Sequence, residues 1–204
     1  MRAEDALIAR KAQGRPPSRA SARATLQSAT DDVHQRMHAH PGYAALAAGV
    51  IKVDAYRRLL ARSYGFYAPI EARIGRGAVR SRRLEADLTA LGMHPCDIDT
   101  LPRCAALPLL ASSAQELGAA YVLEGAALGG RVLAGALVNN VSGMTPPTAF
   151  LLGDGADGGQ RWREFVDQLE ADLSGTAERA AAAQGARATF ETFETWMAGW
   201  DHLE

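Results

Sequence analysis

The chain has 204 residues, of which 48% are hydrophobic and 22% charged, and its 22 Lys and Arg nearly balance 23 Asp and Glu. This length suits a single domain with a sizeable core, and the near-neutral balance excludes a strongly basic nucleic-acid-binding surface or an acidic tail. Because two cysteines are too few for a disulfide framework and the N-terminus shows no secretory pattern, we expect a cytoplasmic protein with neither nucleic-acid nor membrane partners.

The first predicted elements are an extension and a helix. Residues 1–21 are polar, rich in arginine and broken by prolines, which predicts a flexible N-terminal extension. Apolar residues then recur at helical spacing from Ala22 to His40, where Pro41 and Gly42 end the pattern. The sequence therefore predicts a helical domain over residues 22–204.

Two further helices precede a loop. Asp54 is the expected N-cap of the first, which carries a broad apolar stripe. The second helix, in SRRLEADLTALG, has Ser81 as its expected N-cap and Gly92 as its stop. A proline-containing loop over Met93–Pro108 then leads to a long helix that begins near Ser113.

The rest of the chain is a turn-rich stretch followed by two helices. SGMTPPTAFLLGDGADGG predicts turns with one short helix, and helices resume near Gln160. No segment alternates as a strand does, and no repeat is present, so the sequence predicts an all-α, single-domain, multi-helix bundle. The last helix presents Phe190, Phe193, Trp196, Met197 and Trp200.

The long helix contains four glycines within YVLEGAALGGRVLAGAL, residues 121–137. Each interior glycine lowers helix stability by about 1 kcal/mol relative to alanine. At about 100° per residue, Gly118, Gly125, Gly129 and Ala136 fall within about 20° of one line. One face of this helix therefore carries no side chain larger than a methyl group, and we call it the bare face.

Three explanations of the bare face compete. Small residues let two helices pack tightly, and this explanation stays open. A transmembrane GxxxG seam is the second, since Leu117–Val138 is about long enough to span a bilayer, but Glu124 and Arg131 near its centre argue against it. The third is a ligand site at which the backbone approaches a planar group closely.

Among the five histidines, His34 and His38 stand four residues apart in VHQRMHAH, at the border of the first helix's apolar stripe. A border histidine can reach a pocket with one ring nitrogen and keep the other for a second partner, although most histidines in such a position are partly exposed and bind no ligand. The pair could also bind zinc, but no further ligand stands at a recognisable spacing. A border histidine and a bare helix face together favour a flat macrocycle between two helices, as in haem binding.

The chain resembles the bacterial haem oxygenases, and particularly the branch that supplies bilin to bacterial phytochromes. LQSATDDVHQRM resembles the family's proximal helix, YVLEGAALGGRVL its distal helix, and FLLGDGADGGQRWREF its later glycine-containing loop. The resemblance covers about Ala22 to Trp200. It implies an enzyme whose substrate, haem, is also its cofactor, and which uses O₂ and external electrons to release biliverdin, carbon monoxide and iron.

Residue by residue, the resemblance makes His34 the proximal iron ligand. Gly125, Gly129 and Gly130 become the distal backbone positions that take part in catalysis by letting the helix approach haem. In animal members an aspartate that organises distal water stands where this chain has Ala126. The resemblance therefore leaves open what holds distal water here.

The resemblance also assigns two positions on the propionate side of haem. Tyr121 matches a position that contacts a propionate in some relatives. Gln27 matches another, where some members have a lysine, and an amide cannot neutralise a carboxylate. Arg179 and Arg187 on the last helix are candidates for the missing charge.

Electrons must come from a partner, because the chain has no Rossmann fingerprint or flavin motif. The resemblance implies a ferredoxin or a flavoprotein reductase, with Arg80, Arg82 and Arg83 as candidate contacts, and a bacterial phytochrome as recipient of biliverdin. Two alternatives remain: a non-catalytic haem carrier or sensor with the same pocket, and a haem-free helical enzyme of thiaminase-like architecture.

Overall fold

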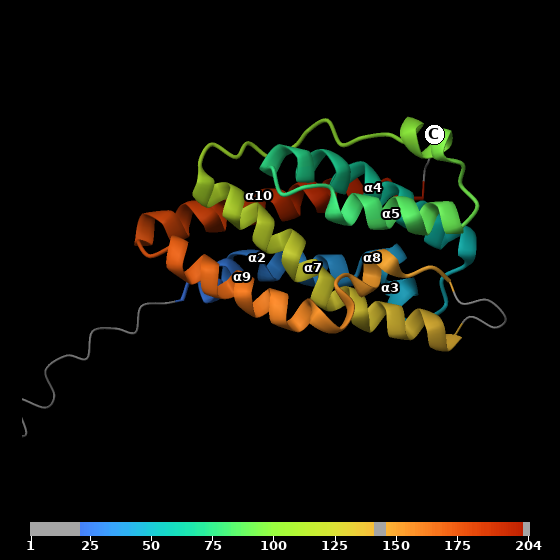
Figure 1. The fold of residues 1–204 in the computed structure, drawn as a ribbon, viewed down its shortest axis with the longest axis horizontal. Coiled ribbons are helices and arrows are strands. Elements are labelled where there is room, and N and C mark those ends of the chain that lie inside the picture. Colours follow the sequence, from blue (N-terminus) through green and yellow to red (C-terminus); the bar gives the residue numbers. More distant parts are fainter. Residues whose placement is uncertain (1–20, 141–145, 202–204) are drawn as a thin grey trace, which may run out of the picture.

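The computed structural model describes residues 21–140 and 146–201, and over these residues it contains helices and no strand (Figure 1). The predicted all-α architecture is confirmed. The expected extension over residues 1–21 lies outside the described residues, apart from Ser21. In chain order the helices are α2 (Ala22–His38), α3 (Pro41–Ala47), α4 (Val53–Ile74), α5 (Val79–Ala90), α6 (Pro95–Thr100), α7 (Ser113–Asn140), α8 (Ala149–Leu152), the 3-10 turn η1 (Gly155–Asp157), α9 (Gly158–Asp172) and α10 (Thr176–Met197).

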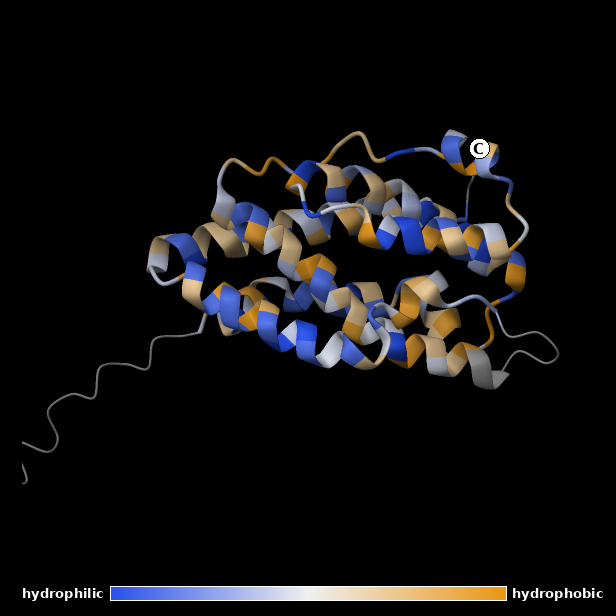
Figure 2. Ribbon diagram, in the orientation of Figure 1, coloured by the Kyte–Doolittle hydropathy of each residue, from blue (hydrophilic) through white to orange (hydrophobic). Residues whose placement is uncertain are grey.

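Helix α10 is the central contact of the bundle. It packs extensively against both α7 and α2, whereas α4 pairs with α5, and α8 bridges α5 and α7. Helix α9 lies against α7 and α2 (Figure 1). Figure 2 shows hydrophilic residues along the outer face of α9 and hydrophobic residues along much of α7, which agrees with the more internal place of α7.

The buried apolar side chains form two clusters. The larger one joins α3, α4, α5, α7 and the second half of α10. The smaller one joins the start of α2 to α9, to the first half of α10 and to the first half of α7. Helices α2, α7 and α10 take part in both clusters, and the extensive contact of α10 with α7 and α2 joins the two parts of the core.

Two expected N-caps are wrong, and one expected C-terminal stop is confirmed. Asp54 lies in the first turn of α4, whose N-cap is Lys52. Ser81 lies inside α5, where Glu71 of α4 accepts hydrogen bonds from the N–H groups of Arg80 (2.8 Å) and Ser81 (3.0 Å). The Glu71 carboxylate, from the preceding helix, thus caps α5 in place of a local side chain.

Gly92 ends α5 as expected. Its φ of 83° lies in the left-handed region, which glycine adopts without strain. Its N–H donates to the Thr89 carbonyl (2.9 Å), and the N–H of Met93 donates to the Leu88 carbonyl (3.0 Å). These two bonds form a Schellman motif.

Two short helices occupy segments for which no helix was expected. Helix α2 ends at His38 rather than His40, and the chain then forms α3, in which Pro41 is the first residue. Helix α6 begins in the same way with Pro95 inside the predicted loop. Proline suits the first helical position because the N–H there has no intrahelical acceptor.

One described helix, α7, is long and apolar enough over Ser113–Leu137 to cross a bilayer, judged by length and composition alone. Core helices of globular bundles satisfy the same criterion, and α7 packs on α10, α8, α3 and α9. Cys96 is exposed and Cys104 buried, and both are free thiols.

Candidate active site

His34 lies on α2 with its ring exposed on one side and packed on the other. Its ring centroid lies 4.6 Å from that of His38 and 5.9 Å from that of Phe190 on α10. Partial burial of the ring and the nearby His38 lower the pKa of His34, and the opposing effect of Asp31 is smaller. The lowered pKa favours the uncharged form of the imidazole, which has a lone pair to offer a metal.

Phe190 lies between two packed regions of α10. One turn before it, Ala186 belongs to the smaller apolar cluster, and three residues after it Phe193 belongs to the larger one. Both of these residues are buried, whereas Phe190 is only half-buried. The part of α10 nearest to His34 thus exposes an aromatic surface between two covered segments.

The bare face of α7 divides into packed and open positions. A Cβ built on Gly118 would collide with the Ala182 carbonyl of α10, and one built on Gly130 with the Leu151 carbonyl of α8. Tight helix packing, one of the two explanations left open by the sequence, therefore accounts for Gly118. It also accounts for Gly130, which the resemblance had placed among the distal catalytic positions.

Gly125 and Gly129 are different, because no backbone packs against them. A Cβ at Gly129 would meet no atom within 4 Å, and one at Gly125 would make only an ordinary 3.7 Å contact with Trp162. Packing within the described residues therefore does not require glycine at either position. Gly135 is equally unobstructed, and no contact accounts for it; on a regular helix it points about 120° away from Gly129.

Helices α2 and α7 flank α10 and pack on it far more extensively than on each other. They converge at one end, where Leu26 and Tyr121 share the smaller apolar cluster. Beyond that end, His34 lies on α2 beside Phe190 of α10, and Gly125 and Gly129 follow along α7 with no backbone packed against them. Val132, on the same flank of α7 as the open glycines, is 76% exposed, so the apolar surface continues along this face.

The converging end is closed by aromatic side chains. The Tyr121 ring lies 5.6 Å from that of Trp162, which in turn lies 5.8 Å from Phe165 of α9. The guanidinium of Arg23, on α2, lies 6.0 Å from the centroid of Trp162. Burial raises the pKa of Tyr121, and the positive charge of Arg23 opposes that rise.

The residues expected on the propionate side fall in different surroundings. Gln27 is exposed on α2 near the converging end. Arg187 is paired with Asp32 (2.8 Å) and also donates to the Ala29 carbonyl (3.0 Å). Arg179 donates to carbonyls at the turn between α9 and α10. Both candidate arginines are therefore engaged in contacts within the protein.

An ion pair connects α7 to α5 on the side of the helix that points away from Gly125 and Gly129. Arg80, with 7% of its side chain exposed, pairs with Glu124 at 2.8 Å. Asp154 accepts hydrogen bonds from Arg83 and Arg161. Two of the arginines expected to meet a reductase, Arg80 and Arg83, thus make internal ion pairs.

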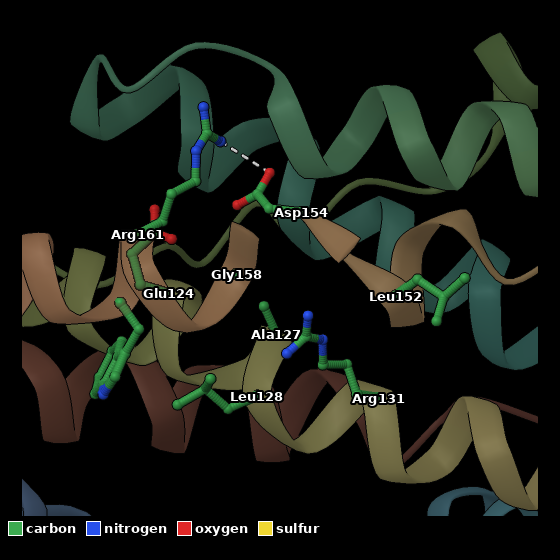
Figure 3. A pocket seen from close by; sticks show the side chains of 9 residues that line it. Glu124, Ala127, Leu128, Arg131, Leu152, Asp154, Gly158 and Arg161 are labelled. Atoms are coloured by element: carbon green, nitrogen blue, oxygen red, sulfur yellow. Dashed lines mark hydrogen bonds and ion pairs between the residues drawn. The ribbon is translucent and has the colours of Figure 1, made fainter. Parts of the chain in front are cut away.

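Figure 3 shows Glu124, Asp154 and Arg161 around a small hollow between α7 and the segment from α8 to α9. Its volume is about 10 Å³, which is room for about one water molecule. It therefore has no room for an organic ligand.

A larger cavity of about 360 Å³ lies between α4, α5, α7 and α9. Residues of α7 that line it, such as Ala120 and Leu123, point away from Gly125 and Gly129 on the helical wheel. Among the described residues that line it there is no histidine, cysteine, methionine or tyrosine. Three of its four arginines, Arg80, Arg83 and Arg161, are paired with carboxylates, and the fourth, Arg76, lies 5.3 Å from the ring of Phe165. This cavity therefore has none of the usual protein ligands of haem iron.

The described residues contain no group of three or more His, Cys, Asp or Glu side chains placed to hold a metal ion. Within this part of the chain, the pair of His34 and His38 therefore has no third ligand of the kind that a structural zinc site requires.

Haem fits the residues between α2 and α7. His34 on α2 offers an imidazole ligand for the iron, and the main chain at Gly125 and Gly129 offers an unobstructed surface on α7. An apolar edge must cover the rest of the macrocycle, and Phe190 and Val132 offer one.

Three side chains of this site were not assigned a role from the sequence: Phe190, Trp162 and Arg23. Phe190 was noted only as part of an apolar stripe. Arg23 stands eleven residues before His34, which is about 20° away on the helical wheel, so periodicity alone carried a signal for it. The place of Trp162 beside Gly125 depends on a contact between distant segments that no local pattern reveals.

Comparison with known proteins identifies the family of the chain. The family model for heme oxygenase matches residues 20–199. A protein named heme oxygenase from Xanthomonas campestris pv. campestris (strain 8004) is 36% identical over 167 residues, which cover 76% of this chain and 95% of that protein.

Two solved structures share the fold. Heme oxygenase from Leptospira interrogans aligns with a TM-score of 0.68 at 16% identity, covering 87% of this chain and 98% of that one. Heme oxygenase-1 from Synechocystis sp. PCC6803, solved in complex with heme, aligns with a TM-score of 0.66 at 16% identity, covering 87% and 91%. The family model over residues 20–199 and the 36% identical Xanthomonas relative show that the chain belongs to the haem oxygenase family.

Proposed function

We propose that this haem oxygenase binds its substrate between α2 and α7, with His34 as the iron ligand and the main chain at Gly125 and Gly129 over the opposite face. The family's reaction opens haem to biliverdin and releases carbon monoxide and iron. The observation that carries the proposal is the pairing of a neutral histidine with glycines that no protein atom crowds.

When bound, haem supplies both the iron that activates O₂ and the ring that is cleaved. His34 holds the iron from one side, and its neutral imidazole lacks the electron push that a thiolate gives toward O–O cleavage. On the other side, Gly125 and Gly129 present backbone, and neighbouring Ala126 is exposed and has no acid or base. The main chain of α7 thereby limits the space open to O₂.

The first experiment is a titration of the purified protein with haem. We expect one haem per chain and a histidine-type Soret band, followed by conversion to a biliverdin spectrum when reductant and O₂ are added. Persistence of the haem band under verified electron delivery would favour the carrier or sensor alternative.

Two matched variants identify the ligand. His34→Ala should lose the native ligation, whereas His38→Ala, one turn along the same helix, should keep it. If His38→Ala alone abolishes the histidine-type spectrum, the iron ligand must be reassigned to His38.

We also propose the partners and the setting of the reaction. Electrons come from a ferredoxin or a flavoprotein reductase, and Arg82, exposed on α5, is the one of the three expected arginine contacts that remains at the surface. The YVLEG string with its following LGG supports the phytochrome-associated branch, with a bacterial phytochrome as the recipient of biliverdin. The two free thiols support a cytoplasmic setting.

Handover of biliverdin is testable with a bacterial phytochrome apoprotein. The enzyme, supplied with haem, O₂ and reductant, should yield a photochromic holoprotein when this acceptor is present. Release of a biliverdin isomer that the acceptor cannot incorporate would exclude the phytochrome-associated role.

A further inference from the structure

Among the described residues that the sequence places on the propionate side of haem, none offers an unpaired cation. Gln27 can donate a hydrogen bond but carries no charge. Arg187 and Arg179 are engaged with Asp32 and with backbone carbonyls, respectively. Another cation of this chain is therefore the candidate partner of a carboxylate, and this inference rests on the proposed function.

Arg23 lies on the face of α2 that carries His34. Eleven residues separate the two, so on a regular helix they differ by about 20° in direction and by about 16 Å along the axis. Gln27 stands one turn from Arg23 on the same face. Arg23 thus occupies the end of the His34 face that points toward the aromatic residues closing the site.

The surroundings of the Arg23 guanidinium contain aromatic rings and no carboxylate partner. It lies 6.0 Å from the centroid of Trp162, and its charge acts on the Tyr121 hydroxyl. By contrast Arg36, the other arginine of α2, pairs with Asp32 (3.1 Å) and with Glu194. Within the described residues Arg23 makes no ion pair, and it is exposed.

The backbone at Arg23 is fixed although its side chain is free. Glu170 of α9 accepts hydrogen bonds from the N–H groups of Ala22 (2.8 Å) and Arg23 (3.0 Å). The Ser21 hydroxyl oxygen accepts from the N–H of Ala24 (3.1 Å) and caps the helix. Arg23 therefore starts from a defined position and can direct its guanidinium without disturbing the helix.

We infer that Arg23 is the cation that binds a haem propionate, at the end of the site closed by Tyr121 and Trp162. Guanidinium and carboxylate match as a bidentate pair. Holding one carboxylate at this end fixes the rotation of haem in its plane. With haem bound, Arg23 would thereby help to set which ring carbon lies nearest the open main chain of α7.

The test compares haem with its dimethyl ester, in which both carboxylates are uncharged. Arg23→Gln should weaken binding of haem about two- to fivefold, as expected for an exposed charge pair, and leave binding of the ester nearly unchanged. Arg163→Gln, which removes an exposed arginine next to Trp162 on α9, is the control and should change neither affinity. Arg23→Lys should restore part of the loss.

The ratio of the two affinities decides the outcome. Equal weakening of haem and ester by Arg23→Gln would mean that Arg23 only supports the fold, and unchanged haem affinity would mean that another group binds the carboxylate. Either result overturns the inference. Both differ from failure of the proposed function, in which the unmodified protein would not form a His34-dependent haem spectrum.

Discussion

Gly129 and Gly130 are neighbours in the chain with different surroundings. Gly129 faces open space, whereas Gly130 packs against the Leu151 carbonyl of α8. Alanine has the higher helix propensity, so Gly129→Ala should stabilise the haem-free protein by about 1 kcal/mol. Gly130→Ala should destabilise it by about 1–3 kcal/mol, because the added methyl group overpacks the contact with α8. Urea denaturation of the haem-free proteins measures both changes.

The same pair of variants tests the role of the open glycine. Gly129→Ala should bind haem more weakly in spite of its greater stability, since its methyl group occupies the surface proposed for the macrocycle. A Gly129→Ala protein that is stabilised and binds haem as tightly as the unmodified chain would place the macrocycle elsewhere.

At the scale of elements, the position of α7 depends on the ion pair behind it. Glu124→Gln leaves the buried guanidinium of Arg80 without its carboxylate, which should lower the free energy of unfolding by about 1–3 kcal/mol. The loss is smaller than for a fully buried pair, because 35% of the Glu124 side chain is exposed.

Glu164→Gln on α9 is the matched control for this pair. Its carboxylate accepts a hydrogen bond from exposed Gln160, so the change should stay within about 0.5 kcal/mol. Chemical denaturation of the two variants side by side gives the comparison. If Glu124→Gln is as mild as Glu164→Gln, the pair with Arg80 does not hold α7 in place.

The helix boundaries show which local features can be predicted from the sequence. Gly92 was predictable as a stop because its function depends only on the left-handed conformation of its own residue. The start of α5 was not, because its cap is Glu71, a residue of the preceding helix. Likewise α3 was missed because Pro41 was interpreted as an end, although proline suits the first turn of a new helix.

The candidate site, like the helix boundaries, could be predicted only in part from the sequence. The helical period predicted a bare face on α7, and the open positions Gly125 and Gly129 belong to it. The period could not reveal that Gly118 instead packs on α10, since that contact depends on Ala182, more than sixty residues away. For the same reason Trp162 could not be placed beside Gly125 from local sequence.

At the scale of the whole molecule, the tyrosines report the integrity of the fold. Burial raises the pKa of Tyr64 and of Tyr67 to about 12. For Tyr64 a hydrogen bond to Glu85 adds to the rise in pKa. For Tyr67 the positive charge of Arg80 opposes the rise. The pKa values of Tyr43, Tyr56 and Tyr121 are also raised, chiefly by burial.

These shifts give a pH dependence of stability with a definite sign. In the unfolded chain tyrosine ionises near pH 10, so between about 10 and 12 the folded protein binds more protons than the unfolded one. The tyrosine contribution to stability is therefore complete below about pH 10 and is lost as pH rises through 12. A titration of tyrosinate absorbance should show suppressed ionisation near pH 10 in the native protein and full ionisation in denaturant. Ordinary ionisation of all five tyrosines in the native protein would contradict their burial.

The most direct measurement is a crystal structure of the ferric haem complex. It should show His34 bound to the iron and the main chain of α7 at Gly125 and Gly129 over the opposite face, with Phe190 along one edge. Haem located in the 360 Å³ cavity behind α7, or bound through any side chain other than that of His34, would contradict the account.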